Sequence, residues 1–204
     1  GNPPPFMKGE GAKMELVEVT PDPDQHALAH VFKIVNDPFR GKLGIFRIHQ
    51  GTITPESQLL IGDARKAFKV SHLYRLQGKE QIEMERGIPG DICAVARVDD
   101  VYFDAVLHDS HDEDNHHLQT MECPVPLYGL AVRPQKRGDE QKLSDALHKL
   151  QSEDPCFHVE HNATVNETIM RGLGELHMQV VLEQLAERFN VHVDTHPPSI
   201  TYKE

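Results

Sequence analysis

Two stretches in the second half of the chain decide its fold class: GDEQKLSDALHKLQSEDP at 138–155 and GLGELHMQVVLEQLAERF at 172–189. Each predicts an α-helix, because its apolar residues recur at i, i+3, i+4 and i+7, the spacing of one helix face. The first face holds Leu143, Ala146, Leu147 and Leu150, and the second holds Met178, Val181, Leu182, Leu185 and Phe189. Gly138 and Asp139 open the first helix, Asp154-Pro155 ends it, and Gly172-Leu-Gly174 turns the chain into the second, over about 175–188.

Four β-like runs surround these helices, at 125–132, 156–161, 165–171 and 191–195. The order strand, helix, strand, strand, helix, strand is that of a ferredoxin-like βαββαβ domain, which we place at 122–196. The two helices should cover one face of its sheet and leave the other for solvent or a neighbouring domain.

The first half of the chain has a different sequence pattern. Short β-rich runs at 29–35, 43–49, 58–61, 68–76 and 91–98 are separated by Gly, Pro and Asp, and no long helix is indicated. This pattern predicts a small antiparallel β-barrel over 25–121. The chain is therefore expected to be a multidomain β and α+β protein.

Two segments lack apolar periodicity. Residues 1–24 hold five of the fourteen prolines, which indicates a leader that is either a linker or a strand leading into the first domain. The tract 108–117, HDSHDEDNHH, is best placed in a loop or connector between the domains.

The charge excludes one class of function. The 204 residues include 32 Asp and Glu against 21 Lys and Arg, a formal charge of −11 with a pI near 5.7, so the chain is not a generally basic protein that coats nucleic acid, and no DNA partner is expected. Residues 25–107 are slightly basic, with eleven basic and ten acidic side chains. Any RNA contact is therefore expected in the barrel.

The cysteines and the hydropathy indicate the compartment. Cys93, Cys123 and Cys156 lie far apart with no CxxC pair, so we expect neither a disulfide framework nor a thiolate zinc site. No apolar run is long enough for a membrane span, and the first residues do not resemble a signal peptide. These features predict a cytoplasmic protein without a membrane partner.

Three cations accompany a turn motif in the barrel. Asp37-Pro-Phe-Arg-Gly41 places turn-forming residues between two strands, with Arg40, Lys42 and Arg47 nearby. One interpretation is a hairpin turn with solvated charges. The other is that Arg40, Lys42 and Arg47 contact RNA phosphates, which position a protein on RNA without specifying its sequence.

The GLGELH motif at 172–177 is not a dinucleotide loop, because His177 stands where a third glycine is needed. Gly172 and Gly174 are expected to form a tight strand-to-helix turn, and Glu175 to lie in the first helical turn, where the macrodipole favours a carboxylate. His177 should point off the edge of the apolar face. We assign it no Ser, Cys or carboxylate partner, which favours a packing or surface role over catalysis.

No motif predicts catalysis by this chain. GxxxxGK[ST], GxSxG, HExxH and CxxC do not occur. A metal site in the tract 108–117, with Asp109, Asp112 and Asp114 as further ligands, is disfavoured because a polar loop does not fix ligand geometry. We therefore expect no catalytic residue and no resident metal.

With these residues set out, the chain resembles elongation factor G, a family of translational GTPases, from about Ala27 to Glu204. The barrel motif Asp37-Pro38-Phe39, Gly90-Asp91-Ile92, Glu153-Asp154-Pro155 with Phe157, and Gly172 to His177 occur in the family's order. The stretches beginning at Pro124 and Pro197 are similar to the start of the third domain and to the lead into the fourth, which makes 197–204 the start of a linker.

The resemblance implies a non-catalytic segment acting in translocation-type protein synthesis. In the family the barrel touches small-subunit ribosomal RNA, the ferredoxin-like domain contacts the small subunit, and the protein has its own GTPase domain and C-terminal domains. The residues that would face the GTPase domain are Gly172, Gly174, Glu175 and His177, and they would lie near the fusidic acid site of susceptible factors. The resemblance implies that GTP and magnesium bind to the GTPase domain.

Departures from the family pattern indicate a paralogue. Residues 96–107 replace the family's GLKxTxTGDTL segment, and Gln179 and Gln184 stand at positions that are usually Glu and Arg. The alternatives are a segment of a ribosomal protection or recycling factor, or a free-standing metal- or protein-binding adaptor. A GxxxxGK[ST] loop upstream of Gly1 would separate the GTPase hypothesis from the adaptor hypothesis.

Overall fold

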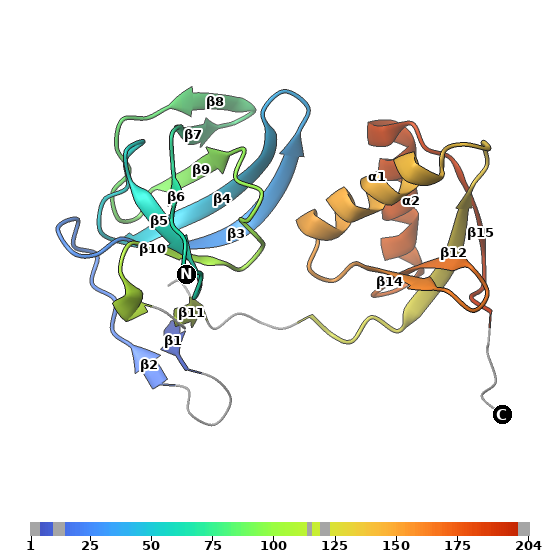
Figure 1. The fold of residues 1–204 in the computed structure, drawn as a ribbon, viewed down its shortest axis with the longest axis horizontal. Helices are drawn as coiled ribbons and strands as arrows, with labels where there is room; N and C mark the ends of the chain where they lie inside the picture. The colour runs from blue at the N-terminus through green and yellow to red at the C-terminus, as the bar shows by residue number, and fades with distance from the viewer. Residues whose placement is uncertain (1–4, 10–14, 114–115, 119–122, 200–204) are drawn as a thin grey trace. The chain divides into compact units, whose positions relative to one another are not determined.

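The chain divides into two compact units, Gly1–Met121 and Glu122–Glu204 (Figure 1). The computed structural model describes residues 5–9, 15–113, 116–118 and 123–199.

The first unit is built on an antiparallel eight-stranded sheet in the order β6-β5-β10-β3-β4-β9-β7-β8. Its strands are β3 (Leu28–Asp37), β4 (Gly41–Gln50), β5 (Gln58–Ile61), β6 (Phe68–Lys69), β7 (Leu73–Gln77), β8 (Glu80–Glu83), β9 (Ile92–Ala96) and β10 (Val106–His108).

The sheet closes on itself for a simple geometric reason. Strands β6 and β7 are joined by residues 70–72 alone, yet they hold the first and seventh places in the sheet order. The four Cα-to-Cα steps from Lys69 to Leu73 span at most about 14 Å, so the sheet must curl to bring these places together. The resulting interior is filled by alternate residues of several strands, among them Val31, Phe46, Ile48, Leu73 and Leu107. The barrel predicted from the sequence is confirmed.

The structure differs from the predicted strands in three places. The run 68–76 is not one strand, because Ser71 has a φ of 63° and interrupts it between β6 and β7. Strands β8 and β10 lie outside the predicted runs. Strand β8 was missed because its sequence, EQIE, is polar and largely exposed.

Both segments without apolar periodicity contain regular structure. Strand β1 (Phe6–Lys8) pairs with both β2 (Glu15–Val17) and β11 (His116–Leu118) in a three-stranded sheet of order β11-β1-β2. The tract 108–117 was expected to be a loop or connector, but its described part contains the end of β10, the 3-10 helix η2 (His111–Glu113) and the start of β11. His108 is buried and hydrogen-bonds through Nε2 to the carbonyl of Gly62, so its imidazole is part of the fold. Asp114 lies outside the described residues.

The second unit has the predicted βαββαβ order: β12 (Tyr128–Pro134), α1 (Glu140–Glu153), β13 (His158–Asn162), β14 (Glu167–Gly172), α2 (Glu175–Phe189) and β15 (Val193–His196). Its antiparallel sheet runs β13-β14-β12-β15. The apolar faces of both helices and Val132, Phe157 and Met170 form one core. The ferredoxin-like prediction is confirmed.

The expectation of no disulfide is wrong. Cys123, ahead of β12, and Cys156, in the turn after α1, form a disulfide with their Cα atoms 5.5 Å apart. Their separation of 33 residues in the chain concealed the pairing. The α1 helix returns the chain to the end of the sheet where β12 begins, so distance along the sequence does not measure distance in space.

Glu167 forms hydrogen bonds with the segment that follows β15. Its carboxylate accepts hydrogen bonds from Ser199 N (3.1 Å), Ser199 Oγ (2.7 Å) and His196 Nε2 (2.8 Å). These bonds, with the Ser199 hydroxyl contributing most, lower the pKa of Glu167 from 4.5 to about 2.

We therefore expect a component of stability that depends on Glu167 and on pH. A carboxyl whose pKa is lower in the folded state stabilises the fold above its unfolded pKa, so this component should be lost as the pH falls from 4.5 towards about 2. Urea unfolding of the protein and of Glu167→Gln, compared over this interval, measures it. The difference between the two should shrink as the pH falls. A difference that stays constant would contradict the assignment.

Candidate functional site

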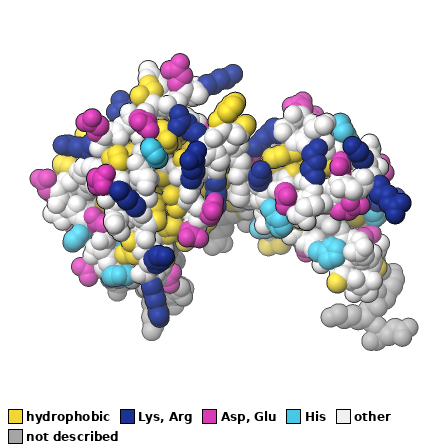
Figure 2. Space-filling model, turned by 45° about the horizontal axis from the view of Figure 1, so that its top comes forward, with side chains coloured by type: hydrophobic (Ala, Val, Ile, Leu, Met, Phe, Trp, Pro, Cys, Tyr) yellow, Lys and Arg dark blue, Asp and Glu magenta, His cyan; other side chains and the backbone are white. Residues whose placement is uncertain are grey.

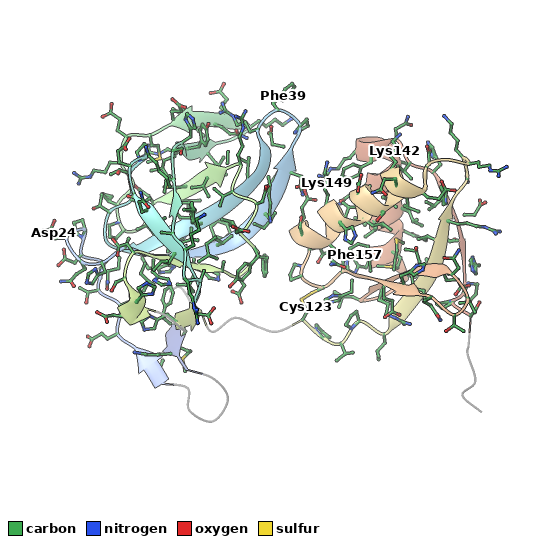
Figure 3. All side chains as sticks on the ribbon, in the orientation of Figure 1. Asp24, Phe39, Cys123, Lys142, Lys149 and Phe157 are labelled. Atoms are coloured by element: carbon green, nitrogen blue, oxygen red, sulfur yellow. A yellow bond between two sulfur atoms is a disulfide. The ribbon has the colours of Figure 1, made fainter. Side chains whose placement is uncertain are left out.

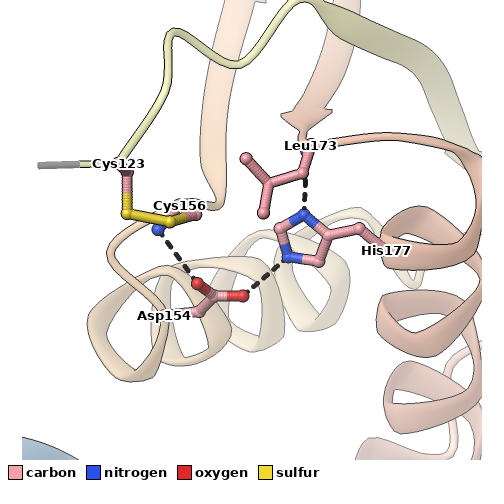
Figure 4. The surroundings of a disulfide bond; sticks show 5 residues. All are labelled: Cys123, Asp154, Cys156, Leu173 and His177. Atoms are coloured by element: carbon pink, nitrogen blue, oxygen red, sulfur yellow. Dashed lines mark hydrogen bonds and ion pairs between the residues drawn. A yellow bond between two sulfur atoms is a disulfide. The ribbon is translucent and has the colours of Figure 1, made fainter. Parts of the chain in front are cut away.

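His177 lies at the centre of a small polar network at the start of α2 (Figure 4). Its Nδ1 accepts a hydrogen bond from Leu173 N at 3.0 Å, so the ring proton sits on Nε2, which donates to Asp154 Oδ2 at 2.7 Å. Asp154 Oδ1 in turn accepts from Cys156 N at 2.9 Å. The ring packs edge-on against buried Phe157, with centroids 6.3 Å apart. His177 is therefore held in one orientation and one tautomer.

The network contains a partner that the sequence did not reveal. We assigned no carboxylate to His177, and this was wrong, because Asp154 contacts it directly. In a βαββαβ fold the two helices run antiparallel, so the end of the first lies near the start of the second. Asp154 is the residue that ends α1, and this topology could have identified it.

Gly172 makes room for the imidazole. A Cβ on Gly172 would lie 2.5 Å from His177 Nδ1 and 2.3 Å from Met178 Cε. The close approach of β14 to α2 therefore requires glycine at this position. Gly174 is the N-cap of α2, and Glu175 lies in the first turn, as expected from the macrodipole.

Helix α2 has a second apolar stripe besides the one that enters the core. Met178, Val181 and Leu185 are buried, whereas Leu176 and Val180 on the outer side of the helix, and Leu173 just before it, are exposed. The exposed fractions are 54% for Leu173, 78% for Leu176 and 49% for Val180. We call these three residues the outer stripe. A groove of about 290 Å³ borders it, lined by His177, Val180 and Arg188 of α2, by Glu153 at the end of α1 and by Asp154 just after it. An apolar stripe of this kind beside a fixed polar group is typical of a docking surface.

The cations predicted in the barrel do not form one cluster. Arg40 lies in the β3–β4 turn, where its guanidinium stacks over Tyr74 at 4.4 Å from the ring centroid. Lys42 and Arg47 are five positions apart on β4, with consecutive residues paired between them, so their side chains leave opposite faces of the sheet. Lys42 Nζ also donates to the carbonyl of Asp99 at 3.0 Å, and burial lowers the pKa of this ammonium.

Hydrogen bonds to the Asp37 side chain hold the turn. Asp37 Oδ1 accepts hydrogen bonds from Phe39 N and Arg40 N, both at 2.8 Å, and these bonds lower the pKa of Asp37. Gly41 has a φ of 74°, which favours glycine. Phe39 is 91% exposed at the tip of the hairpin (Figure 3).

Arg40 has different basic neighbours from those predicted. It lines a pocket of about 470 Å³ with Lys69, His72 and Arg97. Lys69 forms an ion pair with Glu56 at 3.1 Å, and His72 lies 3.0 Å from Glu83. Arg97 is exposed on a backbone with a φ of 60°, just after β9. On the face shown in Figure 2, basic and acidic side chains are interspersed. The lining of the pocket itself includes Arg40 and Arg97 and no Asp or Glu.

Within the described ranges, no three His, Cys, Asp or Glu side chains are arranged to hold a metal ion. None of the helices in those ranges is both long and apolar enough to cross a bilayer.

Comparison with known proteins identifies the family. Residues 26–104 match the family model of elongation factor G domain 2, and residues 123–197 match that of elongation factor G domain III. The chain belongs to the elongation factor G family. The barrel is thus its second domain and the ferredoxin-like unit its third, as the resemblance implied.

Relatives in the elongation factor G family cover nearly the whole chain. Elongation factor G of Rhodopirellula baltica is 34% identical over 188 residues, and that of Amoebophilus asiaticus is 32% identical over 201, covering 92% and 98% of this chain. A solved structure of a Thermus thermophilus protein matches with a TM-score of 0.73 and 29% identity, covering 87% of this chain. The chain spans 26% and 28% of the two factors and 26% of the solved chain.

Proposed function

We propose that this chain is the non-catalytic, ribosome-binding and interdomain-coupling segment of a cytoplasmic GTPase that acts in protein synthesis, of the translocation type. The main support for the coupling role is the outer stripe of α2, which lies beside His177. Family membership supports the ribosome as partner, and the pocket around Arg40 supports contact with small-subunit RNA. The acidic third domain is left for protein neighbours, including small-subunit proteins and the C-terminal domains.

The outer stripe suits the GTPase domain of the same protein as its partner. Leu173, Leu176 and Val180 offer apolar contact area, and the His177 network fixes the turn that presents Leu173. GTP and its magnesium would be held by the GTPase domain, where they order loops that dock on such a face and release it after hydrolysis. The role of this chain is to present a rigid face that distinguishes the two states.

The test is a pair of polar substitutions in the full-length protein. Leu176→Ser with Val180→Ser should reduce ribosome-stimulated GTP hydrolysis by about tenfold, because docking loses its apolar contact, while the unfolding free energy changes by less than about 1 kcal/mol at these exposed positions. Single-turnover hydrolysis with purified ribosomes measures the effect.

Val165→Ser is the matched control, because Val165 is an exposed apolar residue in the β13–β14 turn of the same unit. It should leave hydrolysis unchanged. If the Leu176/Val180 variant also hydrolyses GTP at the normal ribosome-stimulated rate, the coupling role is excluded.

A further inference from the structure

The disulfide lies where it can act on the proposed docking face. Cys156 is two residues beyond Asp154, and its own N–H is the donor that holds Asp154 Oδ1 (Figure 4). The opposite oxygen of Asp154 holds His177, which in turn accepts from Leu173 N. A chain of one covalent bond and three hydrogen bonds therefore links Cys123 to the outer stripe.

We expect the third domain to keep its fold when this bond is reduced. Its core joins both helices to the sheet through Val132, Leu147, Phe157, Met170 and Leu185, all of them buried. Disulfides are essential mainly in small domains that lack such a core. The bond adds a local constraint between the start of the domain and the turn after α1.

The three cysteines differ in accessibility. Cys93 is fully buried in the barrel, and burial raises the pKa of its thiol to about 12, so it is inert towards exchange. Cys123 and Cys156 are only partly buried. In the cytoplasm, a location that rests on the proposed function, accessible disulfides are reduced and re-formed by dithiol proteins and glutathione.

We propose that Cys123 and Cys156 are a reversible thiol–disulfide exchange site whose state controls the order of the Asp154–His177–Leu173 network. The reaction partner is a dithiol of the thioredoxin class. One of its thiolates attacks a sulfur of the Cys123–Cys156 bond, forms a mixed disulfide and releases the other protein cysteine as a thiolate. The second thiolate of the dithiol then attacks the dithiol's own sulfur in the mixed disulfide, closes the dithiol's disulfide and releases the remaining protein cysteine as a thiolate. The protein gains two electrons and two protons, and the dithiol becomes a disulfide.

The first test counts thiols in the 204-residue protein alone, so it needs neither ribosomes nor GTP. After equilibration in mixtures of reduced and oxidised dithiothreitol, acid quenching and alkylation under denaturing conditions, intact mass should show one transition between three alkylated cysteines and one. Peptide mapping should assign the remaining thiol to Cys93. Three free thiols in every mixture, or a bond that includes Cys93, would overturn the proposal.

The second test asks what the bond controls. Reduction should speed amide hydrogen exchange at Leu173 and Cys156 by about tenfold or more, while the amide of Leu147, inside α1, keeps its rate. Cys123→Ser should reproduce the reduced state in any buffer, and Cys93→Ala should retain the redox response. Equal acceleration at all three amides would mean that the bond stabilises the whole domain, and no acceleration would mean that it has no effect on the network. Either result would overturn the proposed control.

Discussion

Reversing the charge of Arg40 and Arg97 together should weaken binding of the full-length protein to small ribosomal subunits by at least about tenfold at low salt. Both guanidinium groups line the same pocket of the barrel, although they come from segments 57 residues apart. Arg40 is preorganised by the Asp37 turn and by stacking on Tyr74, so it can contact a phosphate with little loss of side-chain freedom.

The salt dependence gives this prediction a second observable. If each arginine contacts one phosphate, Arg40→Glu with Arg97→Glu should lower the slope of log affinity against log salt by about two. Co-sedimentation with small subunits over a range of salt concentrations measures both the affinity and the slope.

A matched double variant separates a local contact from a general effect of charge. Lys66 and Lys79 are exposed on the same barrel and do not line the pocket, so Lys66→Glu with Lys79→Glu makes an equal change in net charge. It should retain most of the binding. Equal losses in the two variants would argue against a phosphate site at the pocket. Arg47→Glu alone tests the cation on β4 whose side chain leaves the face of the sheet opposite to that of Lys42.

What the sequence predicted correctly depends on local periodicity. The burial of Leu143, Ala146, Leu147 and Leu150 follows from their spacing, because a helix places such residues on one face regardless of its surroundings. The GLG turn before α2 is equally local. These local features were sufficient to predict the fold class and to support the family resemblance.

What the sequence did not reveal depends on contacts between distant segments. Arg97 lies near Arg40 because β9 pairs with β4, and Lys69 joins them because the barrel closes; no spacing in the chain encodes either contact. Asp154 lies 23 residues from His177 and Cys123 lies 33 from Cys156, yet both contacts occur where α1 ends. The outer stripe of α2 is a different case, because Leu173, Leu176 and Val180 are visible in the sequence. They were not recognised as a second stripe, because the buried apolar face alone was enough to predict the helix.

Phe157→Ala should be the most damaging single substitution in the third domain. Phe157 is fully buried, packs in the core formed by both helices and the sheet, and lies edge-on to His177. Removing a buried phenyl ring costs about 3–5 kcal/mol, because the transfer free energy is lost and a cavity remains. A domain of this size has a free energy of unfolding of only about 4–12 kcal/mol, so the substitution would remove a large part of it.

The same substitution in the barrel provides the control. Phe39 is 91% exposed at the hairpin tip, so Phe39→Ala should change the unfolding free energy by less than about 0.5 kcal/mol. Urea unfolding followed by hydrogen exchange should show the effect of Phe157→Ala in residues 123–199 and an unchanged barrel, since each unit has its own core. A cost for Phe157→Ala no larger than that for Phe39→Ala would contradict the packing described here. A loss of protection that extends equally into the barrel would show that the two units unfold as one, because a cavity in one core can destabilise the other only if they share a cooperative transition.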